Sequence, residues 1–352
     1  MGLLRAWWQL FKGIGSGAKA GRQVDQLFRY YVLKTLDDIG FFAYVQGPKP
    51  FGTILTEFGF SENSYTMELF STLSKDPKGI LTERGGLYTL HPGFEMPDLE
   101  RALQKSYARV RPFIKMAEVM AANILERLRE EPAGVREIFE REDHRVTEMF
   151  RELLSSGSYS TVRSATFAYL PQGDRDWLRG KHLLEIGCGS GLETAEIWLA
   201  FGGDVHITAV DAVPRMVDLA RTRFEALLDE LDPDHPPVTE ANRPRFEEGQ
   251  AQRLPFADGT FDAAFMMFVL HWTPDPGQAI AESVRVVRPG GLLFGAQAYR
   301  PLVNPYMNLV IRSSRNSYGF CWREDLLNWY REIGVDAQIA TPAGILLARK
   351  PA

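Results

Sequence analysis

The sequence predicts an α/β protein in which a parallel sheet, covered by helices on both faces, follows a mainly helical N-terminal region. From Lys181 onward, short apolar runs alternate with helical patterns, as they do when helices connect parallel strands. The first of these runs ends in a glycine-rich turn over residues 187–191. Between residues 23 and 170, by contrast, apolar residues recur mainly at helical spacing.

Residues 1–22 form an N-terminal segment with an amphipathic helical pattern. Its apolar positions are Leu3, Leu4, Trp7, Trp8, Leu10, Phe11 and Ile14. Arg5, Lys12, Lys19 and Arg22 all come before the first acid, Asp25. Apolar stripes of this kind usually pack on protein, which favours docking on the same chain or on a second copy. The alternative is peripheral membrane contact through residues 1–15. A signal peptide is not indicated, because the apolar core and the cleavage site are missing.

Residues 23–95 carry the pattern of a winged-helix domain. Three helices are expected, and the segment GILTERGGLYTL then predicts a β-hairpin that turns at Gly85 and Gly86. The expected helices lie over 23–40, closed by Gly40, over 51–58, and over 61–74, capped by Ser61 or Asn63.

The charge of this region argues against DNA. In a winged-helix regulator the helix over 61–74 would enter the major groove, yet it holds Glu62 and Glu68 and no lysine or arginine. DNA binding depends on cations that neutralise phosphates, and the formal net charge of the whole chain is -5. We therefore expect no nucleic-acid partner. A DNA-binding regulator with a nucleotide-like ligand remains the alternative function.

Residues 96–175 are expected to be a helical linker on the substrate side of the protein. Their runs of charge are typical of solvated helix faces. Pro112 kinks or breaks the long first pattern, and Pro132 and Gly134 separate it from the next helix. The segment PQGDRDWLRG marks the boundary to a last domain over residues 176–352.

This last domain begins with a site for a nucleotide-like ligand. Parallel sheets bind ligands beyond the carboxyl ends of their strands. The first strand, HLLEIG, ends in Gly187-Cys188-Gly189-Ser190-Gly191, whose glycines let a ligand approach the backbone, and a helix N-terminus follows. Asp211 ends the second strand, DVHITAVD, where a carboxylate can accept both hydroxyls of a ribose.

Two cofactors fit this plan, and Glu185 distinguishes them. A dinucleotide fingerprint requires glycine where this chain has Leu192, and an acid at Glu185 would repel the pyrophosphate of NAD. S-adenosylmethionine carries a cationic amino group and a sulfonium, together with one carboxylate for the helix N-terminus. The acid therefore favours S-adenosyl-L-methionine as the cofactor.

Four motifs in order resemble those of class I S-adenosylmethionine-dependent methyltransferases: EIGCGSG, VDAVPRMVDLAR, GQAQRLPFADGTFDAAFMMFVLHW and ESVRVVRPGGLLF. The resemblance runs from about Trp177 to the C-terminus. It implies a Rossmann-like methyltransferase sheet of seven strands, the last one antiparallel, with GILLARK as that edge strand. The N-terminal half resembles the winged-helix dimerisation domain of small-molecule O-methyltransferases, which implies a homodimer.

The resemblance also implies which residues hold the cofactor. The glycines flank its methionine part and Asp211 binds the ribose. Ala212 and Met216 line the adenine, and Ala251 and Gln252 lie near its edge. The family often has Asp where this chain has Gln250, whose amide can also bond adenine. The full set is Glu185, Gly187, Cys188, Gly189, Gly191, Asp211, Ala212, Met216, Gln250, Ala251, Gln252 and Met267.

His271 is the candidate catalytic residue, because it follows the fourth strand in the segment VLHWTPD. Small-molecule O-methyltransferases carry a similar Val-Leu-His segment with a histidine as base, whereas other members of the superfamily have an ordinary histidine there. Both roles stay open. The other five histidines show no metal-ligand spacing, so no metal site is expected.

The acceptor is expected to be small, and hydrophobic, aromatic or lipid-like. The chain lacks the Asp/Asn-Pro-Pro-aromatic and Pro-Cys motifs that mark methylation of nucleic-acid bases. The apolar segment at 299–322 lies where the family often places its acceptor lid. Two cysteines, Cys188 and Cys321, favour a reduced compartment, so a cytoplasmic enzyme with possible membrane association is expected.

Overall fold

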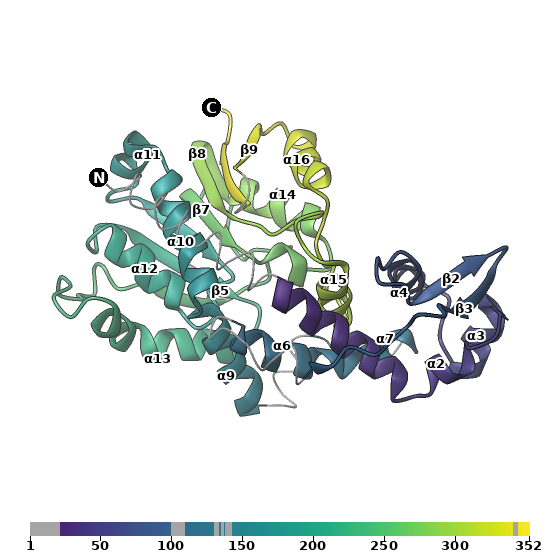
Figure 1. Cartoon of the computed structure of the whole chain (residues 1–352). Coiled ribbons are helices and arrows are strands. Elements are labelled where there is room, and N and C mark those ends of the chain that lie inside the picture. The colour runs from purple at the N-terminus through teal and green to yellow at the C-terminus, as the bar shows by residue number, and fades with distance from the viewer. Residues whose placement is uncertain (1–21, 100–109, 130–133, 135–136, 138–142, 341–343) are drawn as a thin grey trace. The chain divides into compact units, whose positions relative to one another are not determined.

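The computed structural model describes residues 22–99, 110–129, 134, 137, 143–340 and 344–352 (Figure 1). These residues divide into two compact units. The first comprises 150–302, 320–340 and 344–352, and the second comprises the described residues up to 149 together with 303–319. The predicted helix over residues 1–22 lies outside the described residues, apart from Arg22.

The first unit is built on a seven-stranded sheet with the order β6-β5-β4-β7-β8-β10-β9. Strands β4 to β8 are parallel, which confirms the fold class predicted from the sequence. The strands are β4 His182–Ile186, β5 His206–Asp211, β6 Arg245–Glu248, β7 Phe261–Met267, β8 Val287–Ala296, β9 Ala337–Ala340 and β10 Ile345–Arg349.

The last strand is antiparallel, as expected, but the prediction that it lies at the edge of the sheet is wrong. β10 lies between β8 and β9 and is antiparallel to both, and β9 forms the edge. The burial of β10 explains this position, because Ile345, Leu346 and Ala348 are all buried. A strand with such an apolar composition is more stable with a partner on each side.

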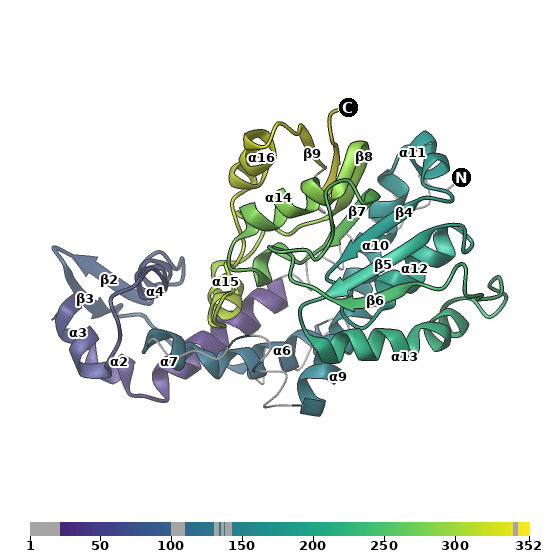
Figure 2. The same cartoon turned by 180° about the vertical axis from the view of Figure 1, so that it is seen from behind.

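Helices cover both faces of the sheet. α10, α12 and α13 lie on one face (Figure 1), and α14 and α16 lie on the other (Figure 2). In β4, Leu183 packs under the first group and Leu184 under the second, because successive strand side chains point to opposite faces. The bounds are α10 Gly157–Tyr169, α11 Gln172–Trp177, α12 Leu192–Ala200, α13 Pro214–Leu231, η1 Leu270–Trp272, α14 Pro276–Val286 and α16 Arg323–Glu332.

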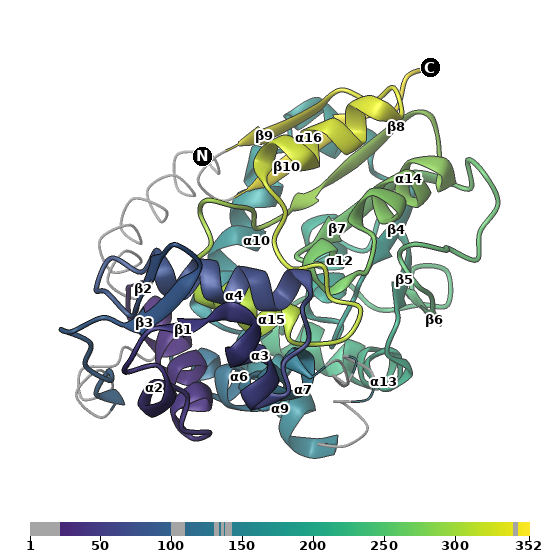
Figure 3. The ribbon, with the colours of Figure 1, turned by 90° about the vertical axis from the view of Figure 1, so that its right-hand side faces the viewer.

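The second unit is mainly helical and holds a small sheet with the order β1-β3-β2. The expected hairpin is confirmed as β2 and β3, and Gly85 and Gly86 both take the left-handed backbone of its turn (Figure 3). Asn63 caps α4 by accepting hydrogen bonds from the N–H groups of Tyr65 and Thr66. The winged-helix assignment itself stays a prediction.

The bounds of this unit agree with the expected helices. Residues 22–37 are helical, the helix predicted over 51–58 is α3, and Pro112 lies in the first turn of α6, where proline fits. The elements are α2 Phe41–Tyr44, β1 Lys49–Pro50, α3 Phe51–Phe58, α4 Ser64–Ser74, β2 Leu81–Arg84, β3 Leu87–Leu90, α6 Arg111–Ala121, α7 Asn123–Leu128 and α15 Pro305–Arg312, with α9 Asp143–Leu154 running into the first unit.

Residues 303–319, which belong to the segment predicted as an acceptor lid, pack in the second unit. α15 contacts α4 and α6. The Nδ2 atom of Asn308 donates to Glu68 Oε1 at 2.9 Å, and Arg312 forms an ion pair with the same carboxylate. Glu68 lies on α4, the helix that a DNA-binding reading would place in the groove. That helix is occupied by α15 contacts instead.

Candidate active site

The site begins at the turn between β4 and α12, where the backbone requires glycine. Gly187 and Gly191 have φ angles of 79° and 84°, in the left-handed region. A Cβ at Gly187 would collide with the side chain of Val269, which follows β7. A Cβ at Gly191 would lie 2.9 Å from that of Ala220 on α13. The two glycines therefore allow the turn to lie close to the segment after β7 and to α13.

Asp211, at the carboxyl end of β5, is bonded to this turn. Its Oδ2 atom accepts from the N–H of Gly189 at 2.9 Å, and its Oδ1 atom accepts from the N–H of Val213 at 2.9 Å. Burial raises the pKa of the Asp211 carboxyl, and the backbone hydrogen bonds oppose that shift. The structure thus brings Gly189 and Asp211 together, as a ligand spanning the two strand ends requires.

Glu185 lies behind the turn and is 1% exposed. Its Oε2 atom accepts a hydrogen bond of 2.5 Å from the hydroxyl of Thr194 on α12, and its Oε1 atom has no hydrogen-bond partner among the described residues. Burial, which is the main cause, raises the pKa of this carboxyl to about 8. Cys188 is also buried, and its thiol packs among apolar side chains.

A buried ion-pair network adjoins the turn, and none of its members was predicted from the sequence. Arg163 of α10 donates to Glu196 at 2.7 Å and lies 3.3 Å from Glu193, both on α12. Glu193 is in the first turn of α12, at the positive end of that helix. The positive end of α12, expected to receive the cofactor's carboxylate, therefore already faces a carboxylate.

The residues predicted near adenine lie around the ends of β5 and β6. Met216 of α13 is buried, Ala212 is exposed, and the N–H of Gly249 donates to the carbonyl oxygen of Asp211 at 3.0 Å. This last bond holds the segment after β6 against the end of β5. Gln250 is exposed, Gln252 is half-buried, and Ala251 packs with Ile186 and Val210.

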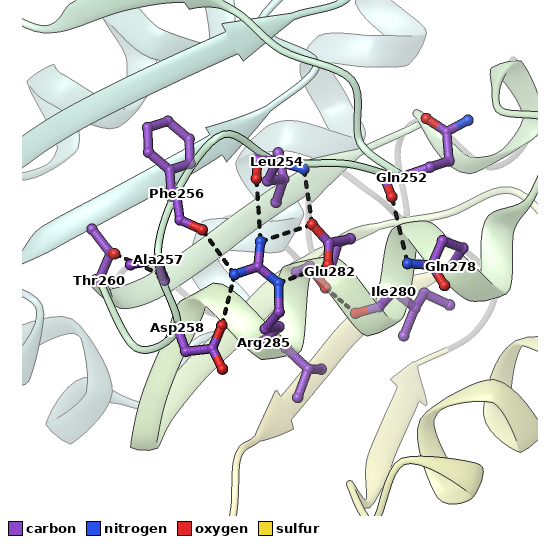
Figure 4. Close-up of polar contacts among 12 residues, drawn as sticks. Gln252, Leu254, Phe256, Ala257, Asp258, Thr260, Gln278, Ile280, Glu282 and Arg285 are labelled. Atoms are coloured by element: carbon purple, nitrogen blue, oxygen red, sulfur yellow. Dashed lines mark hydrogen bonds and ion pairs between the residues drawn. The ribbon is translucent and has the colours of Figure 1, made fainter.

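Helix α14 fixes the continuation of that segment (Figure 4). Glu282 accepts from the N–H of Leu254 at 2.9 Å, and Arg285 donates to the carbonyl oxygen of Phe256 and to Asp258, each at 2.8 Å. The side chain of Gln278 reaches the carbonyl oxygen of Gln252 at 3.5 Å. The loop that carries Gln250, Ala251 and Gln252 is thereby bonded to α14.

The end of β7 forms the remaining side of the site. Met267 is buried, and Phe268 has a φ of 54°, which is uncommon for a residue with a side chain and often marks functional positions. His271 in η1 is 5% exposed, and its ring stacks on Phe320 with centroids 4.6 Å apart. Its Nδ1 atom has no hydrogen-bond partner among the described residues. Burial lowers the pKa of His271 to about 3, so the imidazole is neutral at physiological pH.

Comparison with known proteins agrees with this arrangement of strands and loops. Residues 184–295, from β4 through most of β8, match the family model described as a methyltransferase domain. Residues 184–295 are therefore a methyltransferase domain. The match covers the glycine turn, Asp211, the loop after β6 and His271. These are the same strand ends that the sequence motifs singled out.

The similar proteins include an uncharacterised protein and a named methyltransferase. The chain is 29% identical over 238 residues to an uncharacterised 37.1 kDa protein in transposon TN4556 of Streptomyces fradiae, which covers 64% of this chain and 60% of that protein. It is 36% identical over 115 residues to the 27-O-demethylrifamycin SV methyltransferase of Amycolatopsis mediterranei. That alignment covers 32% of this chain and 37% of the methyltransferase. It thus spans less than two thirds of the curated relatives' length.

Among solved structures, the CurJ carbon methyltransferase has a similar fold. The TM-score is 0.68 with 16% identity, and the similarity covers 100% of both chains. At this identity the comparison concerns the fold alone. It extends the likeness beyond the methyltransferase domain to the N-terminal region.

Proposed function

We propose that the protein transfers the methyl group of S-adenosyl-L-methionine to a small, largely apolar acceptor. Class I methyltransferases generally use this cofactor. The observation that carries the proposal is the glycine turn bonded to Asp211, together with the buried carboxyl of Glu185, whose Oε1 atom has no hydrogen-bond partner among the described residues. Acids on both sides of the turn suit a cofactor with two cationic groups and would repel the pyrophosphate of a dinucleotide.

The cofactor's parts match the site residues. Asp211 uses one lone pair of each oxygen on the backbone, and a carboxylate has further lone pairs for the two ribose hydroxyls. Ala212, Met216, Gln250, Ala251, Gln252 and Met267 would enclose the adenine. Gly187, Cys188, Gly189 and Gly191 would lie along the methionine part, and Glu185 would provide negative charge near its amino group and sulfonium.

Methyl transfer requires alignment more than chemical assistance. The acceptor's electron pair displaces the sulfonium in line, and the protein orients the two reactants and excludes water. An acceptor that carries an acidic O–H, N–H or C–H must also lose a proton. A neutral imidazole at His271 can take that proton. Relatives and neighbours include an O-methyltransferase and a carbon methyltransferase, and either acceptor chemistry fits this role.

The DNA-binding alternative has no support from the structure. α4 contains Glu68, which bonds Asn308 and pairs with Arg312 of α15. Binding to a phosphate backbone requires cations, and α4 carries no lysine or arginine. The resemblance of the N-terminal half to a dimerisation domain supports the proposal of a homodimer. Light scattering of the purified protein tests this proposal, because it measures the mass of the particle in solution.

Calorimetric titration with S-adenosylmethionine tests the proposed function. Binding at micromolar to sub-millimolar cofactor is expected, together with stabilisation of the folded protein against heat. A protein that is folded by circular dichroism and yet shows no binding at about millimolar cofactor, a range reached by weak sites, would overturn the proposal. NAD serves as the matched negative ligand, because it shares the adenosine part, lacks the amino and sulfonium groups, and carries a pyrophosphate that the acids would repel.

A further inference from the structure

Three carboxyl groups lie around the glycine turn: Glu185 and Glu193 are buried, and Asp211 is half-buried. Glu185 is the penultimate residue of β4, Glu193 lies in the first turn of α12, and Asp211 is the last residue of β5. Burial is the largest cause of a raised pKa in all three. Such a group of acids is stable only if protons or cations neutralise part of its charge.

Arg163 is the cation that the structure places among these acids, and its guanidinium is already engaged. Its Nε and Nη2 atoms donate to the two oxygens of Glu196 at 2.7 and 3.1 Å. Its Nη1 atom donates to the carbonyl oxygen of Leu154 at 2.6 Å and to Glu193 at 3.3 Å. Arg163 thus neutralises the carboxylates of α12 and stays on that side of the turn.

Glu185 is left without a counter-charge. Thr194 supplies a neutral hydroxyl to one oxygen, and the other oxygen has no partner among the described residues. The neighbours across the sheet, Ala209 of β5 and Phe265 of β7, do not titrate. The charged groups that act on Glu185, which are Glu193 and Asp211, are both acids and oppose its ionisation.

The remaining titratable groups near the turn are of no help to an ionised Glu185. Burial raises the pKa of the Cys188 thiol well above its usual value, so the thiol stays neutral. Burial likewise raises the pKa of Tyr159 on α10, on which Glu193 and Arg163 also act. Among the described residues, none supplies a cation to Glu185, and a cationic cofactor would supply one.

We propose that Glu185 selects the cofactor by charge: its carboxyl is protonated in the free protein and gives up that proton when a cationic cofactor enters. The inference rests on the proposed function and deepens it. The proton passes to the buffer, and the carboxylate becomes the counter-charge of the sulfonium and the ammonium. Direct contact is unnecessary, because charges interact strongly across a buried, water-poor region.

The sign of the pH dependence follows from this linkage. In the free protein the pKa of Glu185 is about 8, and a bound cation lowers it. Below that value the cofactor must displace a proton, so its affinity rises with pH by up to about tenfold per unit. Above it the carboxyl is already ionised in the free protein, and the contribution of Glu185 becomes constant.

Calorimetry in paired buffers measures the released proton. S-adenosylmethionine is titrated into the full-length protein between pH 6.5 and 7.5 in two buffers with different heats of ionisation, and the difference in heat gives the protons released. We expect about one proton for the wild type and about none for Glu185→Gln. The cofactor's own amino group titrates at about 7.7–8.0, like other α-amino groups, and the Gln variant corrects for it.

The reaction product, S-adenosylhomocysteine, isolates the sulfonium charge. We expect Glu185→Gln to weaken S-adenosylmethionine about tenfold at pH 8.5 and the product distinctly less. If Glu185→Gln does not fold, two Thr194 variants test the same inference. Thr194→Val removes the hydroxyl that favours ionisation and should move the pH midpoint of affinity upward, whereas Thr194→Ser should restore it.

Asp262→Asn is the matched control, because Asp262 is a buried acid in β7 that bonds the backbone N–H of His182, at the start of β4. It should leave proton release unchanged. Equal proton release by the wild type and Glu185→Gln, or an unmoved midpoint in Thr194→Val, would overturn the inference while cofactor binding stands. Loss of all binding in the wild type would instead overturn the proposed function.

Discussion

Asp211 bonds the backbone of the glycine turn and is also the proposed ligand of the ribose. Substitutions can separate these two roles. The structural role is the pair of hydrogen bonds to the N–H groups of Gly189 and Val213. Asp211→Ala removes both bonds and the ribose acceptor, so cofactor affinity should fall by about 1–3 kcal/mol. Asp211→Asn keeps one oxygen acceptor, so its cofactor affinity should lie between those of the wild type and Asp211→Ala. Isothermal titration calorimetry measures both, and an alanine variant with wild-type affinity would remove Asp211 from the cofactor site.

His271 tests the chemistry of the acceptor. If it removes a proton, His271→Ala should lower turnover by about a hundredfold while cofactor affinity stays nearly constant. Because burial lowers its pKa to about 3, the imidazole is already in its basic form at neutral pH. The turnover rate should therefore not rise through pH 6.5, the value expected for an exposed histidine. An alanine variant that keeps most of its activity would assign His271 to packing against Phe320.

At the scale of elements, Arg163 connects α10 with α12 beside the glycine turn. It is 2% exposed, and its removal leaves Glu193 and Glu196 without their cation. Arg163→Met should therefore lower the free energy of unfolding by about 3–5 kcal/mol, as breaking a buried ion pair does. Arg179→Met breaks an exposed pair with Asp204 and should cost about 1 kcal/mol or less. Urea unfolding of both variants measures these two free energies. Similar losses in the two variants would contradict the prediction.

The elements that sequence patterns predicted well are those with local causes. The glycine turn, the cap at Asn63 and the hairpin at Gly85 and Gly86 each depend on backbone rules that act within a few residues. Arg163 was not predicted, because its partners follow thirty or more residues later, and a charge run looks like a solvated helix face. The position of β10 was wrong for the same reason, since strand order in a sheet depends on non-local pairing.

At the scale of the whole molecule, residues 303–319 leave one unit for the other and return. The sequence places them inside the methyltransferase domain, but their side chains complete the second unit. Tyr306 donates its hydroxyl to Asp76, which also pairs with Arg29 at 2.8 Å. The apolar side chains of residues 303–319 suit an acceptor lid and a packed core equally well. Only the tertiary contacts distinguish the two.

The N-terminal segment gives the whole molecule a second proposed property, membrane contact. Trp7 and Trp8 lie in an apolar stripe, and Lys12, Lys19 and Arg22 precede the first acid, so such a helix would lie in the headgroup region of an anionic bilayer. Among the described helices, none combines the length and the apolar character that a membrane crossing requires.

Vesicles that contain phosphatidylglycerol test the contact by flotation. If residues 1–15 contact the membrane, the full-length protein should float with the vesicles, and deletion of these residues should abolish flotation while cofactor affinity is unchanged. A Trp7→Ser, Trp8→Ser double variant should lose most of the binding, because interfacial tryptophans contribute much of the apolar area that such a helix buries. High salt should weaken the remainder, since its attraction is electrostatic. A full-length protein that stays at the bottom of the gradient, or a deletion variant that still floats, would favour docking of this helix on protein.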